Sequence, residues 1–170
     1  MKVTGYQLKE ALKIKAVIIS ALYNEHEDSI FKFEDEEKRS LDEILVDIEK
    51  HEKENAIIQT VQSEFNLSNE VEIPTLGKMS LEQAIKLVGG YGRMAKMYRS
   101  FAKGGTKDRW ERDRTKTRNN NEETAKPVIT RNKAIIHAKQ LERVASDLRS
   151  AIAMANSKTF DTIMLTEDML

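Results

Sequence analysis

Apolar side chains that recur at three- and four-residue steps run through most of this 170-residue chain. This spacing places them on one face of an α-helix. The pattern covers four segments, which are residues 6–27, 41–65, 81–101 and 131–156. We therefore predict an all-α fold in which long helices form an elongated antiparallel bundle. The whole chain, residues 1–170, is expected to be a single helical domain.

Residues of the kind that cap helices stand before three of these segments. Thr4 precedes the first segment. Ser40 with Glu43, and Ser80 with Gln83, have the spacing of a capping box, in which two side chains satisfy free backbone donors reciprocally. These residues predict where the first three helices begin.

Four stretches lack the helical pattern, and the first of them is residues 28–39. Within residues 66–79, Val71 and Ile73 are expected to form a short extended piece. Residues 103–130 are expected to form a basic, irregular insertion between the third and fourth helices, with room for a short hairpin. The tail, residues 157–170, carries apolar side chains that suit docking on the bundle or on another subunit.

Three glycines in four residues, at positions 89–92, interrupt the third helical segment. In a helix they cost about 2–3 kcal/mol relative to alanine. We expect the helix to bend there or to contact another backbone closely. In the alternative interpretation, backbone N–H groups exposed there bind an anion together with Arg93 and Lys96.

Two polar positions stand out on the first two helical segments. Lys15 lies on the apolar stripe of the first, and its stem is expected to follow the apolar surface with the amine in water. His51 lies four residues after Asp47, so a hydrogen bond between them is favoured over half of a metal site. The spacings of helical metal sites are missing, and we predict no metal and no cofactor.

The charges are segregated although their sum is zero. Residues 1–75 carry 9 basic and 17 acidic side chains, a net charge of −8, and residues 76–170 carry 19 basic and 11 acidic ones, a net charge of +8. Residues 93–118 hold ten Lys and Arg against three Asp and Glu. This asymmetry indicates an anionic partner for the basic half, or pairing of the two halves.

Several classes of protein are excluded or disfavoured. The chain has no Cys, which excludes disulfides, thiolate metal sites and Cys nucleophiles. No apolar run approaches the roughly 20 residues of a membrane span, and the first residues do not resemble a signal peptide. We therefore expect a cytoplasmic protein that does not enter a membrane. No catalytic motif is present, so we expect no enzyme.

The basic cluster predicts a site that captures a phosphate-bearing small ligand, such as a nucleotide signal, and sequesters it without turnover. Arginine binds phosphate with two parallel hydrogen bonds, and an indole stacks on a base. The protein that carries this site is expected to be a homo-oligomer. The predicted ligand-binding residues are Tyr91, Arg93, Lys96, Arg99, Arg109, Trp110, Arg112 and Arg114.

Other interpretations of the same charges stay open. The basic segment can pair with its own Asp108, Glu111 and Asp113, or with the acidic second helix. The chain would then be a structural, self-associating helical protein whose acidic and basic halves meet. Single-stranded nucleic acid binding through Trp110 is a further alternative, which the zero net charge makes less favoured.

The chain resembles the septicolysin-like group of small helical proteins. The similar features are the stretches at 8–12 (LKEAL), 77–84 (GKMSLEQA), 98–99 (YR) and 152–156 (IAMAN). The resemblance implies an all-helical fold and no established enzymatic activity. The chain departs from the group at the glycines of residues 89–92, where the group has an unbroken third helix, and in the enlarged basic connector.

Overall fold

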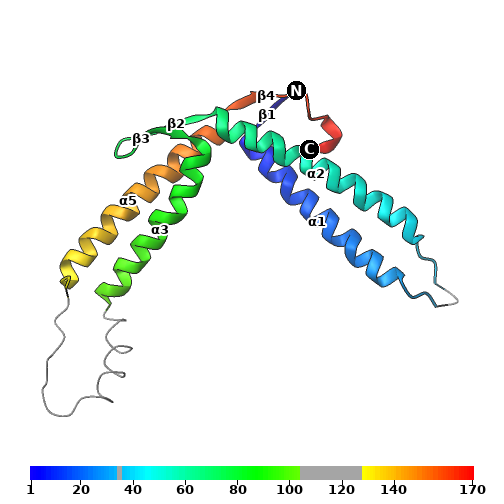
Figure 1. Ribbon diagram of the computed structural model, residues 1–170, viewed down its shortest axis with the longest axis horizontal. Helices are drawn as coiled ribbons and strands as arrows, with labels where there is room; N and C mark the ends of the chain where they lie inside the picture. Colours follow the sequence, from blue (N-terminus) through cyan, green and yellow to red (C-terminus); the bar gives the residue numbers. More distant parts are fainter. Residues whose placement is uncertain (34–35, 104–127) are drawn as a thin grey trace, which may run out of the picture. The chain divides into compact units, whose positions relative to one another are not determined.

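The computed structural model describes residues 1–33, 36–103 and 128–170, and it is predominantly helical (Figure 1). The broad prediction of an all-α protein is confirmed. The long helices of the described residues are α1 (Gly5–Ser29), α2 (Leu41–Ser68), α3 (Leu81–Ala102) and α5 (Arg131–Asn156). The short elements are β1 (Lys2–Thr4), β2 (Glu70–Ile73), β3 (Gly77–Ser80), β4 (Thr159–Asp161) and the 3₁₀ turn η1 (Glu167–Met169).

The chain divides into two compact units. Unit 1 comprises Met1–Glu70, Ser80–Glu82 and Ala153–Leu170, and unit 2 comprises Val71–Met79 and Gln83–Ile152. The single domain and the elongated bundle expected from the sequence stay predictions.

In unit 1, α1 and α2 form an antiparallel pair. Leu22, near the end of α1, packs with Ile44 and Ile48 near the start of α2. Two of the three predicted caps are confirmed, because Thr4 and Ser40 each form a capping box with the residue three positions later. Large side chains fill this interior, and those that are fully buried include Leu8, Ile44, Ile58, Val61 and Phe65.

The tail of the chain docks on unit 1. Strand β4 pairs antiparallel with β1, with Val3 opposite Phe160. The Phe160 ring meets the buried Phe65 ring edge-on, with centroids 6.0 Å apart, and Leu165 is buried. Of the two expected docking partners, the tail therefore contacts its own chain.

Gly5, the first residue of α1, is buried because two neighbours approach its backbone closely. A Cβ atom at this position would lie 2.6 Å from the Phe65 ring and would also clash with the side-chain oxygen of Asn156. No larger residue fits here unless the Phe65 ring or the Asn156 side chain moves.

In unit 2, α3 lies antiparallel beside α5 (Figure 1). Alanines dominate the buried positions of both helices, including Ala84 and Ala95 on α3 and Ala138 and Ala145 on α5. Strands β2 and β3 form a two-stranded sheet. The extended piece predicted at Val71 and Ile73 is confirmed as β2, whereas the sequence pattern did not indicate β3.

Helix α3 continues through the glycines at 89–92. The glycines therefore do not break the helix. A Cβ atom at Gly90 or Gly92 would meet nothing within 4 Å, so no other backbone approaches them. Residues inside a helix bond their backbone N–H groups to carbonyls four positions earlier, which disfavours an anion site at these groups. That alternative stays a prediction.

Candidate functional site: a buried charge cluster and exposed helix faces

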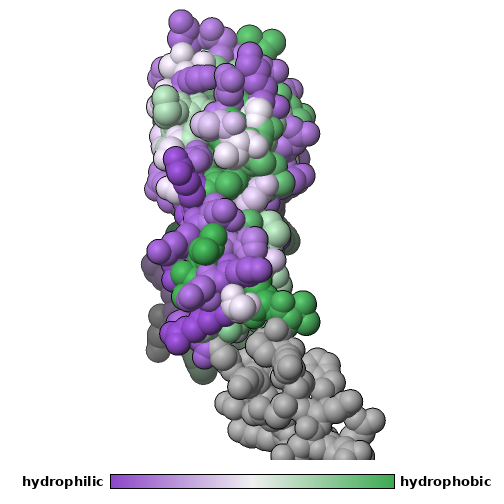
Figure 2. Space-filling model, turned by 90° about the vertical axis from the view of Figure 1, so that its left-hand side faces the viewer, coloured by the Kyte–Doolittle hydropathy of each residue, from purple (hydrophilic) through white to green (hydrophobic). Residues whose placement is uncertain are grey.

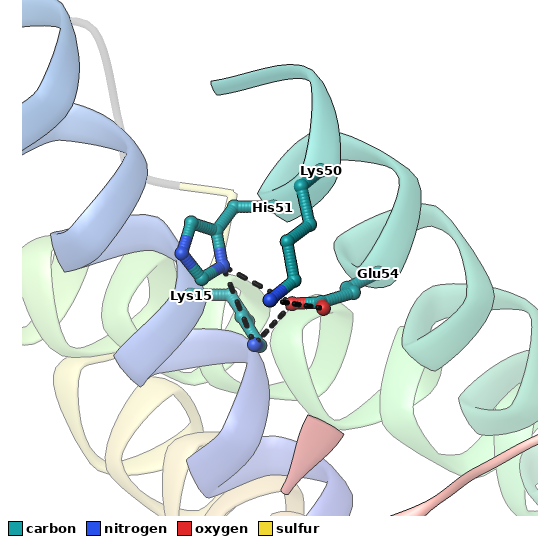
Figure 3. A network of polar contacts seen from close by, with 4 residues as sticks. All are labelled: Lys15, Lys50, His51 and Glu54. Atoms are coloured by element: carbon teal, nitrogen blue, oxygen red, sulfur yellow. Dashed lines mark hydrogen bonds and ion pairs between the residues drawn. The ribbon is translucent and has the colours of Figure 1, made fainter. Parts of the chain in front are cut away.

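A buried ion pair joins the middle of α1 to α2 (Figure 3). The Nζ of Lys15 lies 2.5 Å from the Oε2 of Glu54, and the two side chains are 7% and 10% exposed. The Nδ1 of His51 lies 3.1 Å from the same oxygen, and the Nζ of Lys50 lies 3.9 Å from Oε1. The expectation that the Lys15 amine lies in water is wrong, because the buried stripe of α1 carries it against α2.

Opposing effects act on the pKa of Glu54. Burial raises this pKa, but the hydrogen bonds and positive charges of Lys15 and His51 lower it by more, so the pKa lies below the ordinary value of a glutamate. Glu54 is therefore ionised at neutral pH. A buried charge requires its partner opposite, so this pair favours one register of α1 against α2.

The hydrogen bond predicted between His51 and Asp47 is not the one found. The Asp47 carboxylate accepts a hydrogen bond from Arg39, and His51 contacts Glu54 instead. Both acids are within one helical turn of His51, and Glu54 lies on the buried side with Lys15. Among residues 1–33, 36–103 and 128–170, no group of three or more His, Asp or Glu side chains is arranged to hold a metal ion.

Part of the predicted ligand site lies on α3. Arg93 and Lys96 are exposed, and three-residue steps place them and Arg99 near one side of the helix. Tyr91 is half-buried. It precedes Arg93 by two residues, which corresponds to opposite sides of a helix. The fold therefore does not bring Tyr91 to the same surface as Arg93 and Lys96.

Arg99 is already engaged by a carboxylate of its own chain. Its Nη2 donates to the Oε2 of Glu142 on α5 over 2.6 Å, and its Nε donates to the other carboxylate oxygen. These hydrogen bonds raise the pKa of Arg99 and lower the pKa of Glu142. A ligand at Arg99 must displace Glu142.

The other half of the predicted site consists of Arg109, Trp110, Arg112 and Arg114. These residues lie outside the described part of the chain. The ligand site as a whole therefore stays a prediction.

Helix α3 carries a second apolar stripe besides its buried one. Leu87, Gly90, Met94, Met97 and Phe101 follow one another at steps of three and four residues, and we name this set the α3 outer face. Its four apolar side chains are between 38% and 46% exposed. Steps of three and four in alternation are the heptad pattern of helices that pack along their length.

The α3 outer face borders a group of rings that reaches α5. Tyr98 meets Phe101 edge-on, with ring centroids 6.0 Å apart. The Tyr98 ring also lies 5.2 Å from the ring of His137 on α5. Three rings thus lie beside the outer face, two from α3 and one from α5.

Helix α1 also has a second apolar stripe. Ile14, Val17 and Ala21 occupy positions i, i+3 and i+7 and are exposed, and we name them the α1 outer face. Val17 is 70% exposed. Figure 2 shows hydrophobic residues among hydrophilic ones on the face of the molecule that it displays. Neighbouring apolar side chains that are exposed on one helix can form a contact with another protein surface.

Comparisons with protein-family models, with curated proteins and with solved structures give no match for this chain. The resemblance to the septicolysin-like group therefore stays a prediction. No helix in the described ranges is long and apolar enough to cross a membrane. The charge cluster and the two outer faces are the features of the described residues that bear on function.

Proposed function

We propose that this chain is a non-enzymatic helical interaction protein that associates with copies of itself. In this proposal, helices from different copies complete the elongated antiparallel bundle that the sequence predicts. A helix in a pair needs only one apolar face, because its other side meets water. The α3 outer face, with its heptad spacing and exposed Met and Leu side chains, is the observation that supports the proposal most directly.

The charge cluster fits this role better than a catalytic one. Lys15 is occupied by Glu54, and the cluster lies inside the α1–α2 pair. Its contribution is to hold α1 and α2 in one register, which keeps the α1 outer face in a defined position.

The test is sedimentation velocity over a series of protein concentrations, for the wild type and for the double variant Met94→Glu/Met97→Glu. We expect the wild type to associate and the double variant to be a monomer, because the assembly would bury two unpaired carboxylates. The matched control is Met154→Glu on α5, at a 73% exposed methionine outside the outer face. A wild type that is monomeric at every concentration contradicts the proposal.

Capture of a phosphate-bearing small ligand is the second candidate. It is favoured by exposed Arg93 and Lys96 on α3. It also relies on Tyr91, Arg99, Arg109, Trp110, Arg112 and Arg114, as the sequence predicts. The purified protein is examined by native mass spectrometry and by its 260/280 nm absorbance ratio for a co-purifying nucleotide. Binding that survives Arg93→Ala/Lys96→Ala and Arg109→Ala/Arg112→Ala unchanged contradicts this site.

Single-stranded nucleic acid binding remains the third candidate and has its own signature. Phosphate contacts release counterions, so affinity for an oligonucleotide would fall steeply as salt increases. An affinity that does not depend on salt contradicts this candidate.

A further inference from the structure

We propose that the α3 outer face of one copy docks on the α1 outer face of a second copy, so that the contact joins two different surfaces. This inference rests on the proposed self-association and names the pair of surfaces that makes it. Three features of the described residues support it: the spacing of both stripes, the open space at Gly90 on the α3 outer face, and the charges of the helices.

The two stripes match in kind. On α3, Leu87, Met94 and Phe101 repeat every seven residues. On α1, Ile14 and Ala21 repeat at the same interval, with Val17 between them. Helices with this repeat pack by placing side chains of one into the spaces of the other.

The α3 outer face has a hole where the α1 outer face has a knob. Gly90 lies between Leu87 and Met94 and has no side chain, and the space around its Cα is open. Val17 is 70% exposed, more than Ile14 at 45%. A β-branched side chain at this point suits the space that Gly90 leaves on a facing helix.

The charges favour this pairing over two copies of the same face. Helices α1 and α2 carry 11 acidic and 5 basic side chains, a net charge of −6, whereas α3 and α5 carry 3 acidic and 9 basic ones, a net charge of +6. Opposite potentials attract across an interface, and like charges oppose the wrong partner. Two α3 faces in contact would bring basic helices together.

The same complementarity holds next to the stripes. Arg93 and Lys96 directly precede Met94 and Met97 on α3 and are exposed. On α1, Glu10 lies four residues before Ile14 and Glu25 four residues after Ala21, so carboxylates stand at both ends of the α1 outer face. Glu10 pairs with Lys13 at 2.9 Å and Glu25 with Arg39 at 3.5 Å. Exposed pairs of this kind are weak and exchange readily.

Two single variants and their mixture test the pairing by sedimentation velocity. Val17→Glu removes the α1 outer face and Met94→Glu removes the α3 outer face. We expect each variant alone to associate at least about tenfold more weakly than the wild type. We expect an equimolar mixture to recover association, because the intact α3 face of one variant meets the intact α1 face of the other. Leu67→Glu, at a 65% exposed position on α2, is the matched control.

The outcomes separate the inference from the proposed function. Association of Val17→Glu at the wild-type level contradicts the inference and points to contact between two α3 faces, while self-association itself stands. A mixture that stays as weak as its components contradicts the inference as well. A monomeric wild type contradicts both.

The absence of Cys provides a second readout. Val17→Cys and Gly90→Cys are oxidised separately and as a mixture, and the disulfide-linked dimers are counted by mass spectrometry. We expect the mixed dimer, which joins one copy of each variant, to exceed both homodimers. Homodimers that dominate the mixture overturn the inference. Circular dichroism of all variants controls for folding, which the exposed position of Val17 and the open space at Gly90 should preserve.

Discussion

The α1–α2 pair and the α3–α5 pair are both antiparallel helix pairs, but they bury different kinds of side chain. The first buries large residues such as Phe65 and Ile58 together with a charged pair, whereas the second buries mainly alanines, with Leu81 and Leu148 as exceptions. Burying a Leu, Ile or Phe side chain contributes about 1.5–3 kcal/mol, and alanine contributes much less. The contact between α3 and α5 therefore contributes less stabilising free energy. Other apolar side chains of this pair remain exposed.

The ion pairs of the two helix pairs also differ in how far they are buried. Lys15 and Glu54 are almost completely shielded from water, whereas Arg99 and Glu142 are 54% and 39% exposed. A shielded pair imposes a register, because either charge without the other is costly. An exposed pair allows its partners to change, since water replaces a lost contact.

The largest effect is expected when the shielded pair is broken. Glu54→Ala leaves the Lys15 amine buried without a carboxylate, which costs about 3–5 kcal/mol of unfolding free energy. Urea denaturation followed by circular dichroism measures this loss. Glu142→Ala is the matched control in the other pair and should shift the urea midpoint far less. The double variant Lys15→Met/Glu54→Leu should recover most of the stability. Equal losses of stability in Glu54→Ala and Glu142→Ala would contradict the difference between the two ion pairs.

The next effect concerns the glycine at the start of α1. In Gly5→Ala, the added methyl group meets the Phe65 ring and Asn156. Overpacking of this kind costs about 1–3 kcal/mol. The thermal midpoint is expected to fall. An unchanged midpoint would mean that the Phe65 and Asn156 side chains adjust without cost, which contradicts the close packing described for unit 1.

In α3, replacing a glycine is expected to increase the stability of the protein. Gly92→Ala adds a methyl group that meets nothing within 4 Å, and alanine favours a helix over glycine by about 0.5–1 kcal/mol. The thermal midpoint and the helical signal should both rise. A fall would show that the position needs glycine for a contact outside the described residues, for example in an assembly.

The smallest expected effect is that the stabilisation contributed by Glu54 depends on pH. The folded pKa of Glu54 lies below its ordinary value, so the stabilisation it provides is present above the ordinary pKa and is lost as pH falls through the folded pKa. The difference in urea midpoint between wild type and Glu54→Gln should therefore narrow as the solution is acidified. Repeating the series at high salt screens the exposed pairs but not the shielded one. A difference that widens in acid contradicts the assignment.

The extent of each helix could be predicted from the sequence because its information is local. The apolar repeats and the capping residues Thr4 and Ser40 lie within the segments that they define. The strands β1 and β4 escaped prediction, since each is three residues long and depends on a partner more than 150 residues away.

The pairing of side chains between helices could not be predicted in the same way. Nothing in the spacing of Lys15 identifies Glu54, and nothing near Arg99 identifies Glu142, because those partners are chosen by how two helices align. One signal was available in the gap between Ile48 and Ile58, where the α2 stripe loses its apolar residues opposite a lysine on α1. The half of the predicted ligand site at Arg109, Trp110, Arg112 and Arg114 lies outside the described residues and stays a prediction.

The pairing of β1 with β4 has a consequence for the order of folding. Unit 1 is built from both ends of the chain, and the segment that forms unit 2 lies between them. The α1–α2 contact joins residues a few tens of positions apart, whereas Val3 pairs with Phe160 near the other end of the sequence. Closing so long a loop costs more chain entropy than closing a helical hairpin. We therefore expect α1–α2 and α3–α5 to form early and the strand pair to close last, as the step that completes the interior around Phe65.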